Sequence, residues 1–243
     1  MSVTVVQLGS GAASVACGGV PTGGLGSLTA EGYFRVLGIA GANRPLVGKY
    51  GADGHEWVLY VSRDGRLYFA VFTGSGVNVA HSAVGAVTFN RWLHLAGCYG
   101  DGACGVLVDG RDVTLVSRAA GGTVSGSAQA VRLGGFIADA GTGFIGRLGW
   151  ARVSDVVRYP GTLRGVDQAP VVDGHTLAQW NMGEGSGGTV DNAQGNAAFD
   201  GVIAGGSWAA SVTSDKVRAL PAMAAGFGGR GLARGAGMGV AHG

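Results

Sequence analysis

Residues 90–116, NRWLHLAGCYGDGACGVLVDGRDVTLV, decide the fold class, because apolar runs alternate in this stretch with two Asp-Gly pairs. Asp101-Gly102 and Asp109-Gly110 supply residues that accept the positive φ angles of tight hairpin turns. The apolar runs between the turns have the length of β-strands and are apolar at nearly every position. The stretch therefore predicts an inner meander of a protein built from two stacked sheets.

The register of this meander follows from the position of the first turn. With the turn centred on Asp101, residues whose numbers sum to 202 face each other: Cys98 with Cys104, Ala96 with Val106, and His94 with Val108. Because side chains alternate along a strand, two faces follow. One face would hold Trp92, His94, Ala96, Val106 and Val108, and the other would hold Leu93, Leu95, Tyr99 and Leu107.

A second hairpin is predicted for residues 57–72, where Asp64-Gly65 separates WVLYVSR from RLYFAVF. A two-residue turn there would pair Tyr60 with Phe69 and Val61 with Tyr68. Further strands are expected at 2–8, 28–38, 44–50, 77–88, 131–136, 144–153, 176–182 and 199–203 and around Trp208, and no segment has a convincing helical period.

Several of these segments together resemble one family. Trp92-Leu93-His94-Leu95-Ala96, followed by a turn and Val106-Leu107-Val108-Asp109-Gly110, resembles the central signature of laminin-G-like, concanavalin A-like jelly rolls. EGYFRV at 31–36, residues 44–50 and the run from 144 to 159 resemble other strands of that fold. The resemblance covers residues 12–210 and implies an all-β, two-sheet antiparallel jelly-roll sandwich. The segments VSDVVRYPGTL and TLAQWNMGEGSGGTVDNAQGN resemble the forms of this domain that are common in tailed-phage virion proteins.

The chain divides into a sandwich over residues 1–213 and an irregular, Gly/Ala-rich C-terminal arm over 214–243. Residues 176–210 would return as closing strands, either onto the same sandwich or swapped into a neighbouring subunit. The arm contains no acid beyond Asp215, and its composition leaves too little apolar surface to order it alone. We therefore expect it to assemble a homo-oligomer, with contacts from Arg218, Phe227, Arg230 and Arg234.

Composition bounds the function. The net charge of +2 gives no strong field for nucleic acid or membrane lipids, and no run of 18 apolar residues could span a bilayer. No signal peptide is visible, so synthesis in a cytoplasm is expected. The three cysteines are expected as reduced thiols, with a disulfide between the facing Cys98 and Cys104 as the alternative.

Catalytic signals are weak. Glycosidases need two carboxylates on one strand face, but the chain has only three Glu, and the close acid pair Asp109 and Asp112 spans a turn. No G-x-S-x-G elbow is present. A histidine such as His94, on an apolar strand face, is expected in the core or at its rim rather than as a base. The sequence thus predicts a protein that is not an enzyme.

Two kinds of binding site are predicted. The turn at 191–196 resembles a family turn linked with a metal, which makes calcium the one candidate cofactor, held by Asp191, Asn192, Asn196 and Asp200. Against calcium, the family's late acid pair is replaced here by Gly149 and Trp150. Glycan binding needs exposed aromatic and polar groups, and the candidates at the rim are Tyr50, Tyr99, Asp101 and Tyr159.

These observations and the resemblance together predict a non-enzymatic virion structural or accessory protein, in capsid decoration or in the tail. It would be made in the host cytoplasm and would use its lectin-like sandwich to contact other virion proteins and itself. The alternative is a glycan-binding adhesion module that recognises a host-surface polysaccharide. A polysaccharide-degrading enzyme is a third hypothesis.

Overall fold

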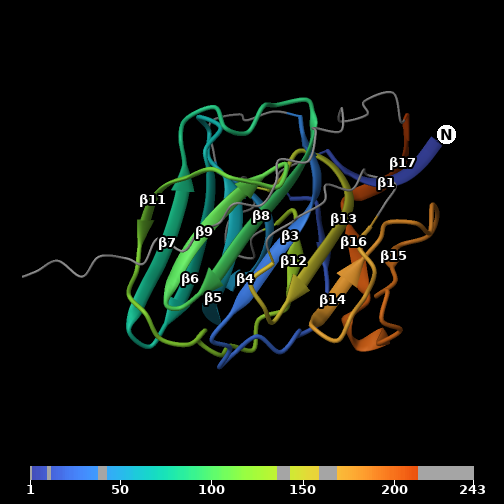
Figure 1. Ribbon diagram of the computed structural model, residues 1–243. Coiled ribbons are helices and arrows are strands. Elements are labelled where there is room, and N and C mark those ends of the chain that lie inside the picture. The colour runs from blue at the N-terminus through green and yellow to red at the C-terminus, as the bar shows by residue number, and fades with distance from the viewer. Residues whose placement is uncertain (1, 10–11, 38–42, 136–142, 159–168, 213–243) are drawn as a thin grey trace, which may run out of the picture.

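The computed structural model describes residues 2–9, 12–37, 43–135, 143–158 and 169–212 (Figure 1). These residues form seventeen β-strands and one short 3-10 helix, η1 (Ala197–Phe199). The strands make two antiparallel sheets stacked face to face, which confirms the predicted all-β sandwich. None of the described residues form a helix long and apolar enough to cross a membrane. The C-terminal arm, with Arg218, Phe227, Arg230 and Arg234, lies outside the described residues.

The eight-stranded sheet contains the meander that begins near Trp92. Its order is β10 (Arg111–Asp112), β9 (Ala103–Val108), β8 (Trp92–Gly100), β3 (Leu28–Val36), β13 (Gly146–Ser154), β1 (Ser2–Leu8) and β17 (Gly206–Val212), and β14 (Thr176–Trp180) also pairs with β13. Strands β14 and β17, from the returning C-terminal segment, thus pair with strands of the same chain.

The nine-stranded sheet contains the predicted hairpin of residues 57–72. Its order is β11 (Thr114–Arg118), β7 (Gly76–Ser82), β6 (Leu67–Thr73), β5 (Gly54–Val61), β4 (Arg44–Gly51), β12 (Arg132–Leu133), β2 (Ser14–Ala16), β16 (Gly201–Ala204) and β15 (Thr189–Val190). Several strands are shorter than predicted: the one expected at 131–136 is β12, and Phe199 belongs to η1 rather than to a strand.

The core lies between the sheets and is made by alternate residues of the long strands. Trp57 and Phe69 from the nine-stranded sheet meet Leu95 and Trp180 from the other sheet in one continuous apolar cluster. The sheets approach closely at Gly97, where an added Cβ would lie 2.2 Å from Cγ of Phe69. Glycine at this position therefore lets an aromatic ring occupy the space between the layers.

The predicted register of the β8–β9 hairpin is wrong by one residue. Asp101 and Gly102 both have positive φ, 51° and 76°, and together they form a two-residue turn. Cys98 therefore pairs with Gly105, and Cys104 pairs with Tyr99.

Two expectations about β9 change as a result. Cys98 and Cys104 point to opposite faces of the sheet, and all three cysteines are free. The faces of β9 are exchanged relative to the prediction, with Val106 in the core and Leu107 on the outward face. The Asp109-Gly110 turn forms as predicted, with φ angles of 49° and 73°.

The register of the β5–β6 hairpin is also wrong by one residue, for a related reason. Tyr60 pairs with Tyr68, and Val61 pairs with Leu67. The loop has three residues rather than two: Ser62 N–H donates to Arg66 O, and Gly65, at φ 75°, donates to Ser62 O at 3.0 Å. A turn followed by a left-handed glycine is the usual three-residue hairpin. This shift places two tyrosines side by side.

Candidate functional site

The outward face of the nine-stranded sheet carries a row of rings across β5, β6 and β7. Tyr60 pairs with Tyr68, and Tyr68 pairs with His81, so the three side chains leave the sheet on the same side. The rings of Tyr60 and Tyr68 are stacked with centroids 4.9 Å apart and an interplanar angle of 6°. His81 lies 4.9 Å from Tyr68. All three side chains are only partly buried, because their strand neighbours, and not they, enter the core.

A second group of rings lies on the same face across β4, β5 and β6. Tyr50 stacks on His55 at 4.1 Å with an interplanar angle of 12°. Phe72 lies 5.7 Å from Tyr50 and 5.2 Å from His55. Between the two groups the sheet carries the small, buried side chains of Val58 and Ala70.

We call these six residues the aromatic face: Tyr50, His55, Tyr60, Tyr68, Phe72 and His81. The two groups are close enough to interact electrostatically. Burial raises the pKa of Tyr60 to about 12, and the nearby phenols of Tyr68 and Tyr50 add to the shift. The Tyr60 hydroxyl is therefore uncharged at neutral pH and can both donate and accept hydrogen bonds. The face thus combines apolar ring surface with neutral hydroxyl groups.

A buried ion pair fixes the position of Tyr50 and His55. Lys49 on β4 pairs with Trp57 on β5, and the next residue of β4, Tyr50, pairs with His55. Glu56 is therefore an extra residue of β5 and forms a β-bulge. Lys49 Nζ lies 2.7 Å from Glu56 Oε1, and both side chains are almost fully buried. Because such a pair is costly to break, it holds the bulge that re-aims the two rings.

The ion pair also fastens two loops to this end of the sandwich. The Glu56 carboxylate accepts hydrogen bonds from the Ser127 backbone, at 2.6 Å, and from the Thr22 hydroxyl. Thr22 in turn accepts a hydrogen bond from Trp57 Nε1 at 3.0 Å. Both Glu56 oxygens therefore have partners within the protein.

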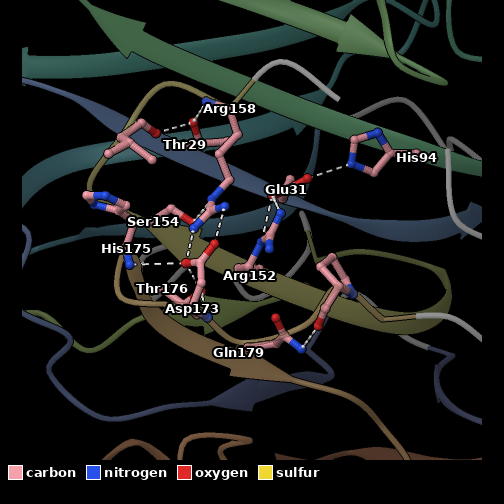
Figure 2. A network of polar contacts seen from close by, with 12 residues as sticks. Thr29, Glu31, His94, Arg152, Ser154, Arg158, Asp173, His175, Thr176 and Gln179 are labelled. Atoms are coloured by element: carbon pink, nitrogen blue, oxygen red, sulfur yellow. Dashed lines mark hydrogen bonds and ion pairs between the residues drawn. The ribbon is translucent and has the colours of Figure 1, made fainter. Parts of the chain in front are cut away.

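The eight-stranded sheet has a different outward face, which holds a buried charge network (Figure 2). Glu31 lies between an arginine and a histidine. Its Oε1 accepts a hydrogen bond from Arg152 Nε at 2.8 Å, and its Oε2 lies 2.8 Å from His94 Nε2. Burial raises the pKa of Glu31, but the hydrogen bonds and charges of His94 and Arg152 outweigh burial, so the pKa lies below its ordinary value of 4.5. Both Glu31 oxygens are thus occupied by partners within the protein.

The connector after β13 is anchored beside this network. Arg158 forms a bidentate pair with Asp173, with bonds of 2.9 and 2.6 Å, and its Nε donates to Ser154. Gln179 Nε2 donates to Pro170 O at 2.7 Å. Tyr33, Trp92 and Trp150 form a separate buried cluster on the same sheet, against which Ala169 packs. This face therefore buries its aromatic rings, in contrast to the aromatic face.

The two-sheet fold agrees with the match of the sequence to a known protein family. The family model described as the concanavalin A-like lectin/glucanases superfamily matches residues 9–162, which is more than half of the chain. The chain belongs to this superfamily. Comparison with curated protein sequences finds no match.

Solved structures share the superfamily's fold at low sequence identity. A protein described as a candidate carbohydrate binding protein from Bacteroides ovatus is 16% identical, with a TM-score of 0.64, over 85% of this chain and 59% of that one. The CBM40 of the Ruminococcus gnavus sialidase, bound to α2,3-sialyllactose, is 14% identical, with a TM-score of 0.49, over 65% of this chain and 92% of its own. Domains LG4-5 of mouse laminin α1 are 20% identical, with a TM-score of 0.47, over 62% and 40%. At these identities the likeness shows the fold alone.

The predicted glycan-binding residues do not form one site on this superfamily fold. Tyr50 belongs to the aromatic face. Tyr99 is fully buried, and its hydroxyl donates to Gly122 O, so the expectation of a rim position is wrong: the alternation of β8 directs it inward with Leu95. Asp101 is exposed in the β8–β9 turn, on the other sheet, where it helps to line a cavity of about 360 Å³. Tyr159 lies outside the described residues.

Three of the four predicted calcium residues each use a side-chain oxygen to accept a local hydrogen bond. Asp200 Oδ1 accepts the backbone N–H of Asn192 at 2.7 Å. Asn192 Oδ1 accepts the N–H of Gln194, and Asn196 Oδ1 accepts that of Ala198 at the start of η1. Asp191 is exposed. Among the residues that the structure describes, no three His, Cys, Asp or Glu side chains group as metal ligands would. Calcium at this turn stays a prediction.

Sequence reasoning missed most of the aromatic face. Tyr60, Tyr68 and Phe72 were recognisable as strand residues, but the incorrect hairpin register paired Tyr60 with Phe69, a core residue. The available signal was the two-residue alternation along RLYFAVF, in which Tyr68 and Phe72 share one face and Phe69 lies on the other.

Proposed function

We propose that this protein is a non-enzymatic glycan-binding module and that the aromatic face is its binding surface. The observation that carries the proposal is the gathering of six rings, in two packed groups, on one outward sheet face, with tyrosine hydroxyls among them. In the described part of the chain, most other large aromatic side chains, including Trp57 and Trp150, are buried.

The chemistry of the face suits saccharides. A pyranose presents C–H groups that pack on aromatic surface and hydroxyls that exchange hydrogen bonds with polar groups of both donor and acceptor character. Tyr60 and Tyr68 stack on each other, so their ring edges and hydroxyls, rather than both ring faces, are directed to a ligand. Such an arrangement favours an extended polysaccharide lying across the strands over a single sugar enclosed in a pocket.

Membership of a lectin and glucanase superfamily supports the proposal without deciding it, because this architecture hosts many activities. The chain spans 59% of the Bacteroides ovatus protein, so the role of that whole protein is not transferred to it. Hydrolysis of a glycosidic bond would require two facing carboxylates. The buried Glu31 and Glu56 are instead each paired with a cation.

A role in a virion rests only on the two sequence segments that resemble tailed-phage proteins, so it stays a prediction. Homo-oligomerisation through the C-terminal arm and location in a phage particle also stay predictions. The two ideas are compatible, since a glycan-binding module could attach a particle to a bacterial surface. The proposal of glycan binding does not depend on the setting.

A glycan array, followed by titration calorimetry with the strongest hit, tests the proposal. We expect Tyr68→Ala to weaken binding about 5- to 150-fold, because loss of one aromatic contact costs on the order of 1–3 kcal/mol. Tyr68→Phe separates the ring from the hydroxyl. Leu115→Ala, at an exposed position on the edge strand β11, is the matched control and should leave affinity unchanged. Failure of the wild-type chain to bind any saccharide would refute the proposal.

A further inference from the structure

One arginine on the outward face of the nine-stranded sheet, Arg132, forms no ion pair with any residue that the structure describes. Arg132 lies on β12, directed outward, because its neighbour Leu133 enters the core. It pairs with Gly48 on β4 and with Ala16 on β2. A glycine and an alanine flank it, so neither adjacent strand places a long side chain beside the guanidinium.

The polar contacts of Arg132 are sparse. Its NH1 donates to Ser14 Oγ at 3.5 Å, which is a long hydrogen bond, and its Nε has no partner. No carboxylate in the described ranges forms an ion pair with it, whereas Arg152 and Arg158 are paired with Glu31 and Asp173. The side chain is partly exposed, so its charge remains available at the surface.

The surroundings of Arg132 have a positive or neutral character. Tyr50 stands two residues from Gly48 on the same face of β4, which makes it the diagonal neighbour of Arg132 at about 7–8 Å between Cα atoms. The other titratable or charged groups that face outward from the described strands β4 to β7, β11 and β12 are His55, Tyr60, Tyr68, His81 and Arg118.

No acid among the described residues balances this face from within its strands. Glu56 is fully buried against Lys49. Asp53 lies in the turn between β4 and β5, and Asp64 lies in the β5–β6 loop, where it pairs with Arg66 at 2.9 Å. Beyond β2, Asp200 directly precedes β16, and its charge, like that of Arg132, reaches Cys17, but it forms no ion pair with Arg132. The strands of the sheet thus present no outward carboxylate among the described residues, and a guanidinium without an ion-pair partner favours ligands of negative charge.

We propose that the ligand is an acidic polysaccharide and that Arg132 binds its carboxylate beside Tyr50. This inference rests on the proposed function and specifies its ligand class. A guanidinium can hold a carboxylate through two parallel hydrogen bonds, a geometry that an ammonium group cannot reproduce. The rings of the aromatic face would hold the sugar backbone, and Arg132 would select uronic-acid units over neutral ones.

The test compares two polymers that differ only in their charge: polygalacturonate and the neutral polymer made by reducing its carboxyl groups. Affinity is measured by calorimetry for the wild type, Arg132→Gln and Arg132→Lys, with thermal melts to establish that each variant is folded. Arg111→Gln is the control, because Arg111 is exposed on β10 at the edge of the other sheet.

We expect the wild type to bind polygalacturonate at least tenfold more tightly than the reduced polymer, with an affinity that falls as salt is raised. Arg132→Gln should remove this preference, Arg132→Lys should restore it only in part, and Arg111→Gln should retain it. Equal binding of both polymers by the wild type, or an unchanged preference in Arg132→Gln, would overturn the assignment to Arg132 while leaving glycan binding intact. Binding of neither polymer, together with an empty glycan array, would overturn both proposals.

Discussion

The substitution Glu31→Gln should destabilise the fold more than any surface change of equal size. Glu31 is 3% exposed, and its partners Arg152 and His94 are 8% and 4% exposed. Glutamine keeps the volume but removes the negative charge, which leaves the Arg152 guanidinium buried without its counter-ion. Breaking a buried pair on one side costs about 3–5 kcal/mol.

The size of the effect can be converted to temperature. For a domain of 150–250 residues, each kcal/mol lowers Tm by about 2–4 °C, so the loss corresponds to a Tm lower by about 6–20 °C at pH 7. The effect should also depend on pH. Because the folded pKa of Glu31 lies below its ordinary value of 4.5, the stabilisation is present above that value and is lost as pH falls through the folded pKa. The difference between wild type and variant should therefore shrink below about pH 4.5.

Thermal and urea unfolding followed by circular dichroism at pH 7, 5 and 3 measures both effects. Glu184→Gln is the matched control, because Glu184 is exposed and its carboxylate accepts one backbone hydrogen bond from Asp191. A Glu31→Gln variant within 1 kcal/mol of the wild type at pH 7, or one whose deficit persists unchanged to pH 3, would refute the reasoning.

Three further predictions concern the core and the turn near η1. Gly97→Ala should lower the free energy of unfolding by about 1–3 kcal/mol in urea titrations, because the new methyl group would overlap the Phe69 ring; an unchanged midpoint would show that the sheets can separate without cost. None of the three thiols should react with Ellman's reagent in the native protein, and all three should react in guanidinium. Burial raises the pKa of Cys98 to about 11, that of Cys104 to about 12, and that of Cys17 above its ordinary range, so the reactive thiolates are scarce in the folded protein. Rapid labelling of the native protein would contradict this prediction. A chelator should leave Tm unchanged, because Asn192, Asn196 and Asp200 each already use one side-chain oxygen to accept a backbone hydrogen bond; a lower Tm would instead support a bound ion.

The fold class was predictable because its signals are local. Alternating apolar residues and Asp-Gly turns occur within short windows, and the turn at Asp109-Gly110 formed where it was expected. Strand register was less predictable, because it depends on whether a turn contains two residues or three. At Asp101 and again at Gly65, one residue of difference exchanged the partners of every following residue.

The functional surfaces depend on contacts that sequence spacing does not reveal. The pairing of Glu31 with Arg152 joins residues 121 positions apart, so each appeared as an isolated charge in a strand. Tyr50 was predicted as a binding residue, but its companions on the aromatic face became visible only when the register of β5 and β6 was known. Tyr99 was misplaced because strand alternation, which directs it inward, was given less weight than its closeness to a turn.

The central claim, that the outward face of the nine-stranded sheet binds glycan, is tested most directly by NMR. Backbone amide shifts of the labelled protein are followed while the saccharide selected by the glycan array is added. The account predicts that the perturbed amides cluster around Tyr50, Tyr60, Tyr68 and Phe72 on β4, β5 and β6. Perturbations confined to the Asp101 turn or to the eight-stranded sheet would contradict it.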